Sequence, residues 1–337
     1  MILQHSLVVY AEHGGETTLL GGVFVLLGTA PAAPVFMVIM GLFFMRPKTI
    51  GLSYGIKRGL ILIALGYVLN VFRFYLPILI ATKFHANLPE FMTPVSFLLS
   101  VDILQLAGLS LIFMSLIRCF LPTQPWTWGA WAFLILIVVI ILVISPLLWG
   151  KFGYNPFLSP FFGDGKAIFF PFFPWVVYPV FGMLLSRFLL NPKDNFIFKI
   201  LVIAGFSLIF IGAALWAQIS NAIIVQGDYH RSGLAVHFVI IGFILIWLPL
   251  CKIVFQQTSN FSFVHKIFLF WSKNTTVIYF IQWVLYGWGI LIFGCELLSA
   301  PVSLFIGIGM CLLSHALTRI FVKLKENTNK SRVGVYH

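Results

Sequence analysis

The chain has 337 residues, of which 61% are hydrophobic and 9% are charged, and its mean hydropathy is +1.04. Soluble globular proteins carry about 25% charged residues, so the composition excludes an ordinary soluble domain. The formal net charge is +12, which in a soluble protein would indicate binding to nucleic acid. Here the basic residues lie in short segments between apolar runs. Membrane topology explains them better, and we expect the lipid bilayer, with no nucleic acid, as the partner.

Nine apolar runs are long enough to cross a bilayer, because about 20 helical residues span a hydrocarbon core of roughly 30 Å. They predict an all-α polytopic membrane protein. In chain order the runs cover 22–45, 59–80, 96–120, 128–149, 168–190, 200–222, 236–255, 275–295 and 300–322.

A shorter apolar run at 1–11 precedes these spans. At 1.5 Å of rise per residue it is only about 16 Å long, which is half a membrane. We expect either a re-entrant piece or the end of a first helix that is truncated at its N-terminus. With that helix included, the prediction is about ten transmembrane helices.

The distribution of basic residues predicts the orientation of the chain. Of the 21 Lys and Arg residues, 16 lie in one set of connections, which includes the C-terminal tail. The excess of Lys and Arg in cytoplasmic loops therefore puts the C-terminus in the cytoplasm. We expect one transmembrane domain at 1–322, a basic tail at 323–337 and an interfacial helix within 256–273. Short loops favour a bacterial inner membrane.

Ionisable residues at membrane depth are costly and tend to be functional. His5 lies in the first apolar run, and an imidazole is well suited to proton transfer near neutral pH. Asp102 falls about one turn into the third full span, with Gln105 on the same helical face and Arg73 in the preceding span. The structural alternatives are a helix–helix hydrogen bond for His5 and an ion pair for Asp102. For His315, in the last span, a helix–helix hydrogen bond is expected.

Two polar segments flank the spans on opposite sides. The outer connection, QGDYHRSG, carries Asp228, Tyr229, His230 and Arg231, which suit the binding of a polar or anionic group. On the cytoplasmic side, MRPKTIGLSYGIKRG carries basic residues that could bind phosphate groups: Arg46, Lys48, Lys57 and Arg58. A solvated loop is the alternative in both cases. The four cysteines have no metal-ligand spacing, so no metal site is expected.

Six stretches, in this order along the chain, resemble the motifs of transmembrane acyltransferases. The most similar subgroup is the heparan-α-glucosaminide N-acetyltransferase-like proteins, and the acyltransferase-three family is its neighbour. The stretches are MILQHSL, APAAPVFMVIMGLFF, IKRGLILIALGYVLNVFRF, VDILQLAGLSLI, FFPFFPWVVYPVFGMLLSR and FWSKNTTVIYFIQWVLYG.

The resemblance implies a membrane enzyme that moves an acetyl group from cytoplasmic acetyl-CoA to a hydroxyl or amine of a glycan-type acceptor on the other side. His5 would be the general base, and Asp102 would hold its imidazole. The acceptor would meet the substrate-binding residues Arg73, Gln105, Tyr229, His230 and Arg231. The acetyl-CoA phosphates would bind the cytoplasmic basic segment. Homo-oligomerisation stays open.

Two departures from the family pattern bear on this expectation. The Leu-Arg-Gly segment that precedes the first-helix histidine in the family has no counterpart before His5. In the late segment, Gln282 stands where a histidine is common, and glutamine cannot titrate. The alternative function is a transporter or flippase of a polar lipid or sugar, in which His5, Arg73 and Asp102 would form a polar relay.

Overall fold

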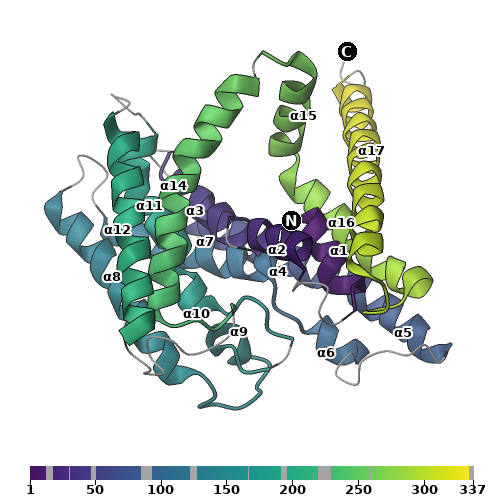
Figure 1. Ribbon diagram of the computed structural model, residues 1–337, viewed down its shortest axis with the longest axis horizontal. Helices are drawn as coiled ribbons and strands as arrows, with labels where there is room; N and C mark the ends of the chain where they lie inside the picture. The colour runs from purple at the N-terminus through teal and green to yellow at the C-terminus, as the bar shows by residue number, and fades with distance from the viewer. Residues whose placement is uncertain are drawn as a thin grey trace. The chain divides into compact units, whose positions relative to one another are not determined.

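The computed structural model (Figure 1) describes residues 1–12, 18–29, 31–46, 51–84, 93–121, 127–165, 167–190, 196–218, 229–258 and 260–333. These residues form helices and two isolated β-bridges, without a strand. Nine helical stretches among them are long and apolar enough to cross a membrane, which confirms the predicted all-α polytopic class. They are Gly21–Phe44, Leu52–Lys83, Ile103–Phe120, Trp128–Leu148, Phe172–Leu189, Phe196–Ala217, Leu234–Thr258, Thr275–Phe293 and Ala300–Thr328.

Contacts within the chain define two compact units, which are described separately. Unit 1 comprises Met1–Thr29, Leu69–Val95 and Ile253–His337, and unit 2 comprises Ala30–Val68 and Ser96–Lys252. The elements that lie wholly in unit 1 are α1 (Ile2–Tyr10), α2 (Leu19–Thr29), the π-helical turn η2 (Val71–Tyr75), α5 (Leu76–Lys83), α15 (Ser262–Lys273), α16 (Thr275–Phe293) and α17 (Ala300–Val333).

Unit 2 holds most of the remaining helices. They are α3 (Ala33–Phe44), α7 (Ile103–Phe120), α8 (Trp128–Leu148), α9 (Ser159–Phe162), α10 (Phe172–Trp175), α11 (Val177–Leu189) and α12 (Phe196–Gln218). Three helices pass from one unit into the other: α4 (Leu52–Asn70), α6 (Pro94–Leu98) and α14 (Leu234–Thr258).

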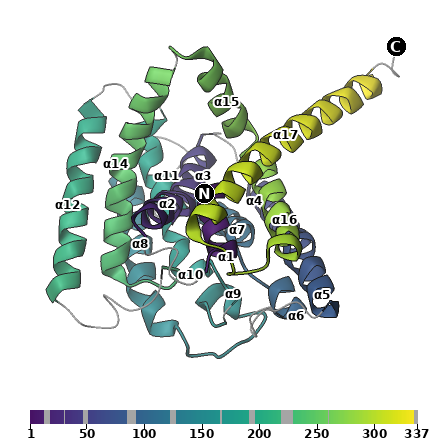
Figure 2. The same ribbon diagram turned by 45° about the vertical axis from the view of Figure 1, so that its right-hand side comes forward.

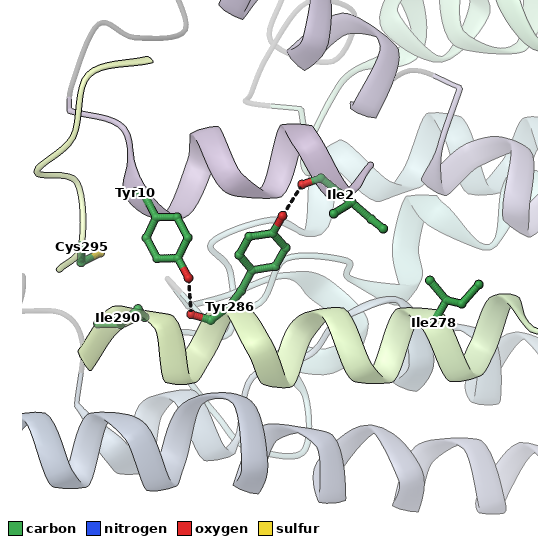
Figure 3. Close-up of a cluster of buried hydrophobic side chains, with 6 residues drawn as sticks. All are labelled: Ile2, Tyr10, Ile278, Tyr286, Ile290 and Cys295. Carbon is green, nitrogen blue, oxygen red and sulfur yellow. Dashed lines mark hydrogen bonds between the residues drawn. The ribbon is translucent and has the colours of Figure 1, made fainter. Parts of the chain in front are cut away.

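Two tyrosine hydroxyls, one bonded to the backbone of α1 and one to that of α16, fix the short helix α1 in unit 1. The Tyr286 hydroxyl of α16 donates to the Ile2 carbonyl at 2.7 Å, and the Tyr10 hydroxyl donates to the Tyr286 carbonyl at 2.9 Å. Figure 3 shows that α1 and α16 run in the same direction between these two bonds. Beyond Tyr10, the backbone pairs with the segment before α17, where the Leu298 N–H donates to the Tyr10 carbonyl. Both ends of α1 therefore have partners.

Proline and glycine shape the contact between η2 and α16. Pro77 has no N–H and its ring crowds the carbonyl four residues earlier, which is that of Arg73. A π-helical turn forms here, and the Arg73 carbonyl lies against Gly287, where an added Cβ would overlap it. The neighbouring Phe72 carbonyl accepts a 3.1 Å hydrogen bond from the Trp288 indole. The carbonyl groups of Phe72 and Arg73, which the π-helical turn displaces from regular helical hydrogen bonds, therefore contact α16 and connect it to η2.

In unit 2, glycines allow α3 and α11 to pack at backbone contact. A Cβ at Gly41 would overlap the Pro179 carbonyl, and one at Gly182 would overlap the Val38 carbonyl. Close packing of this kind replaces the hydrophobic effect between helices in a membrane. The paired glycines therefore position α11 on α3.

A second glycine pair joins α12 to α14, which lie side by side in Figures 1 and 2. Gly205 and Gly242 each approach the other's carbonyl. On α12, the side chains of Phe206 and Phe210 are 61% and 76% exposed. Large apolar side chains at this exposure are typical of a helix that faces lipid.

The predicted interfacial segment contains a helix, α15, none of whose side chains is buried. The Trp271 indole N–H donates to His315 Nδ1 on α17 at 2.8 Å, which confirms the helix–helix hydrogen bond expected for His315. Helix α17 continues to Val333, through the boundary predicted between 322 and 323.

The start of the third full span was predicted wrongly. The sequence placed it at residue 96, but α6 ends at Leu98 and α7 begins at Ile103. Asp102 is therefore the residue before the helix, and it does not lie one turn inside it.

Replacement of Gly182 by Ala should lower the stability of unit 2. The new methyl group would overlap the Val38 carbonyl, and overpacking typically costs about 1–3 kcal/mol. The midpoint of thermal unfolding in detergent measures the effect. Gly309→Ala on α17, where an added Cβ meets nothing within 4 Å, is the control and should leave the midpoint unchanged. Equal midpoints for both variants would contradict the close packing of α3 and α11.

Candidate functional site

His5 lies on the side of α1 that faces α16. Its ring is 4.3 Å from the Trp283 ring, measured between centroids, and 6.2 Å from that of Tyr286. The Gln282 amide nitrogen lies 3.5 Å from His5 Nδ1. The half-buried imidazole therefore contacts three residues of α16, which are Gln282, Trp283 and Tyr286. We call His5, Arg73, Gln282, Trp283 and Tyr286 the His5 cluster.

Arg73 enters the cluster from the π-helical turn. Its side chain is fully buried, and Nε and Nη2 donate to the Asn70 side-chain oxygen at 3.1 and 2.8 Å. The guanidinium carbon lies 4.8 Å from the centroid of the Trp283 ring and 4.4 Å from that of Phe74. Cation–π contacts strengthen when they are desolvated. Arg73 and His5 therefore contact the same indole, from two different elements.

Two polar atoms of the cluster are buried without a hydrogen-bond partner among the described residues. They are Gln282 Oε1, on a side chain with no exposed surface, and Trp283 Nε1. An unpaired buried polar group costs about 1–3 kcal/mol. Their position beside a half-buried imidazole is typical of a site that binds a polar group.

A groove opens at the first turn of α1, next to the turn that carries His5. Its volume is about 480 Å³ and its lining is mostly apolar. Gln4 lines it from α1, Thr275 and Ile278 line it from α16, and Leu27 lines it from α2. The groove can accommodate a narrow, largely apolar arm within one helical turn of His5.

Cys295 is the buried thiol of the hydrophobic cluster between α1 and α16 (Figure 3). Burial, and then the adjacent Glu296 carboxylate, raise the pKa of this thiol to about 11. The thiolate is the nucleophilic form of cysteine. Cys295 therefore stays a neutral packing group near neutral pH.

Asp102 and Gln105 form a capping box at the start of α7 in unit 2. Asp102 Oδ1 accepts from the Ile103 N–H at 2.7 Å, and Gln105 Oε1 accepts from the Asp102 N–H at 3.1 Å. The Asp-x-x-Gln spacing is a signature of a helix start that the sequence analysis missed. These contacts give both side chains a structural role within unit 2, and a role of Asp102 beside His5 stays a prediction.

Tyr229, His230 and Arg231 anchor their segment to the rest of unit 2. Arg231 donates to the carbonyls of Gly163, Gly165 and Ile168 at 2.7, 2.9 and 3.1 Å. The Trp175 indole donates to the His230 carbonyl at 2.8 Å and contacts the Tyr229 ring.

Burial raises the pKa of Tyr229, so its phenol stays protonated. Asp228, from the same predicted outer connection, lies outside the described residues. The contact of this segment with an acceptor stays a prediction.

Three of the four residues predicted to bind phosphate are exposed, namely Arg46, Lys57 and Arg58, and Lys48 lies outside the described residues. The Arg58 guanidinium donates to the Tyr54 hydroxyl at 2.8 Å.

Arg118, at the end of α7, lies 3.6 Å from Met45 Sδ, next to Arg46 in the chain. It therefore adds a fourth basic side chain at this end of unit 2. Its place among the basic residues predicted to face the cytoplasm was visible in the sequence, but its proximity to Met45 was not.

Trp283 and Tyr286 were not predicted as site residues. Both lie in the stretch FIQWVLYG, one and four residues after Gln282. An aromatic residue at these spacings is common in any apolar helix, so only the packing of α1 identifies them.

Comparisons with models of protein families, with curated proteins and with solved structures find no match to this chain.

Replacement of Arg231 by Lys should destabilise unit 2. One ammonium cannot reach three carbonyls in the planar arrangement of a guanidinium, and lost hydrogen bonds to a charged group cost about 1.5–3 kcal/mol. Thermal unfolding and the rate of proteolysis within 159–170 measure the loss. The matched control is Arg58→Lys on the exposed face of α4. Wild-type behaviour of Arg231→Lys in both assays would rule out an anchoring role.

Proposed function

We propose that this protein is a membrane-embedded acyltransferase in which His5 is the general base. The acetyl group would come from cytoplasmic acetyl-CoA and pass to a hydroxyl or amine of a glycan-type acceptor on the other side of the membrane. The observation that carries the proposal is the contact between His5 and Gln282, 3.5 Å apart although 277 positions separate them in the chain. These are the two positions that resemble the histidine motifs of the first and late segments of the transmembrane acyltransferases.

In this mechanism, one nitrogen of His5 accepts the proton of the acceptor O–H or N–H as that atom attacks the thioester carbonyl. The new C–O or C–N bond forms and the C–S bond breaks. The imidazolium of His5 then returns the proton to the departing CoA sulfur. A positioned general base typically contributes 10²–10⁴-fold to the rate.

In each unit, taken by itself, one feature of the described residues is compatible with a part of a CoA thioester. The exposed side chains of Arg46, Lys57 and Arg58 suit its phosphate groups, because basic side chains form strong charge-assisted hydrogen bonds with phosphate. The groove of about 480 Å³ at the start of α1 suits its pantetheine arm, since it is mostly apolar and carries amide and hydroxyl groups from Gln4 and Thr275. We propose that the basic end faces the cytoplasm of a bacterial inner membrane, as the C-terminus would.

The proposal first requires that acetyl-CoA binds. A ligand that binds only the folded state stabilises it by about 2.7 kcal/mol at 100 times its Kd. Acetyl-CoA should therefore raise the thermal midpoint of the detergent-purified protein, and Arg58→Gln together with Lys57→Gln should weaken this shift several-fold. Lys266→Gln together with Lys273→Gln on α15 is the charge-matched control. Absence of any shift, in protein shown to be folded, would contradict the proposal.

His5→Ala should lower acetyl transfer to an acceptor at least about 10²-fold while acetyl-CoA still shifts the thermal midpoint. His265→Ala removes an imidazole from α15, which lies outside the His5 cluster, and should retain wild-type turnover. Release of CoA thiol and acetylation of a glycan-type acceptor are both measured. Full turnover in His5→Ala would refute the role of His5. Uptake of a polar lipid or sugar into vesicles without acetyl-CoA would favour the transporter.

A further inference from the structure

The helix α15 connects two candidate membrane spans, Leu234–Thr258 and Thr275–Phe293. The chain leaves the membrane at the end of the first span and enters it again at the start of the second, so α15 belongs to one face of the bilayer. A helix at that place can meet acyl chains with its apolar side chains and lipid headgroups with its basic ones. The distribution of Lys and Arg predicts that this face is cytoplasmic.

Two attachments hold α15, and both leave its lysines exposed. His265 is hydrogen-bonded to the last residue of α14 at 3.3 Å, and Trp271 donates to α17 at 2.8 Å. At about 100° per residue, Lys266 and Lys273 lie roughly 20° apart around the helix and at least about 80° from either attachment. Both side chains are exposed. Among the described residues, neither lysine is bonded to a carboxylate.

The neighbouring face of α17 extends this positive charge. His315, which accepts the bond from α15, is followed by Arg319 four residues later and by Lys323 eight residues later, and these spacings share a helix face. Both basic side chains are exposed, and Glu326 is the single carboxylate of α17. The basic side chains on the two helices, which we call the basic surface, are Lys266, Lys273, Arg319 and Lys323.

A large apolar side chain lies beside the positive charge on α15. Phe263 is 74% exposed and precedes Lys266 by three residues, so the ring and the ammonium group occupy adjoining parts of the helix surface. A soluble anion would contact only the basic groups. A phospholipid would contact both, with its phosphate at the lysines and its acyl chains at the phenyl ring. The combination therefore favours a lipid.

We propose that the basic surface binds the headgroups of anionic phospholipids in the leaflet that borders α15, while Phe263 contacts their acyl chains. Charge complementarity is the reason for this choice of partner. Each Lys or Arg near an anionic leaflet gains about 1 kcal/mol, which is about fivefold in binding constant. The proposal does not depend on acyl transfer, and it assigns the basic surface to a lipid and not to acetyl-CoA.

The first test measures how lipids stabilise the full chain in detergent micelles. Phosphatidylglycerol should raise the midpoint of thermal unfolding more than phosphatidylcholine at the same mole fraction, because only the former carries a net negative charge. The difference should shrink in about 0.5 M salt, which screens exposed charges. Equal stabilisation by the two lipids would overturn the proposal.

Charge substitutions locate the response on α15. Lys266→Gln together with Lys273→Gln should raise the phosphatidylglycerol concentration for half-maximal stabilisation by roughly 25-fold. Lys83→Gln together with Lys151→Gln removes two exposed lysines from connections predicted to lie on the opposite face, and this charge-matched control should respond as the wild type does. An equal loss in both double variants would overturn the proposal.

The second test separates a lipid from a soluble anion. Phe263→Ser should weaken the response to phosphatidylglycerol several-fold and leave the midpoint in detergent alone unchanged, since this side chain is exposed. Inorganic phosphate at the same concentration should give no stabilisation. Stabilisation by phosphate alone would assign the basic surface to a soluble anion and overturn the proposal. The acetyl-CoA shift should persist in Lys266→Gln together with Lys273→Gln, so the two proposals fail separately.

Discussion

Two tyrosine hydroxyls hold the first helix in place, and the candidate site depends on them. A helix of nine residues leaves four N–H and four carbonyl groups without partners at its ends, and the bilayer interior offers no water to satisfy them. The hydroxyls of Tyr10 and Tyr286 link the backbones of α1 and α16, and Leu298 pairs with the end of α1. Leu298 thereby satisfies a terminal carbonyl of α1, and the two hydroxyls hold α1 against α16, which places His5 beside Gln282 and Trp283.

The same constraint explains why glycine recurs at the closest contacts. Helices in lipid gain little from burying apolar surface against one another, so they associate through close packing and hydrogen bonds. Gly41 and Gly182 bring α3 and α11 into backbone contact, and Gly287 admits the Arg73 carbonyl. The last contact orders the turn that carries Arg73. A glycine such as Gly287, which has no reactive group of its own, therefore helps to determine where the Arg73 side chain lies.

Sequence analysis predicted the class of the fold and all nine spans, because length and hydropathy alone define a membrane helix. It placed Asp102 wrongly, because an apolar run does not reveal that a helix ends at Leu98 and restarts at Ile103. It selected His5 by its chemistry and its motif. It did not single out Trp283, because contacts between residues about 280 positions apart depend on how α1 packs. Local patterns such as the capping box were readable, and long-range partners were not.

The π-helical turn has a consequence for the geometry of its span. An α-helix turns by about 100° per residue, so the one additional residue that a π turn accommodates offsets the faces before and after it by a similar angle. Within unit 1, Pro77 and the Arg73 carbonyl direct the segment after Asn70 toward α16. A regular helix of the same composition would present a different face to α16. The widened turn therefore acts as a phase shift that selects which side chains of this segment meet that helix.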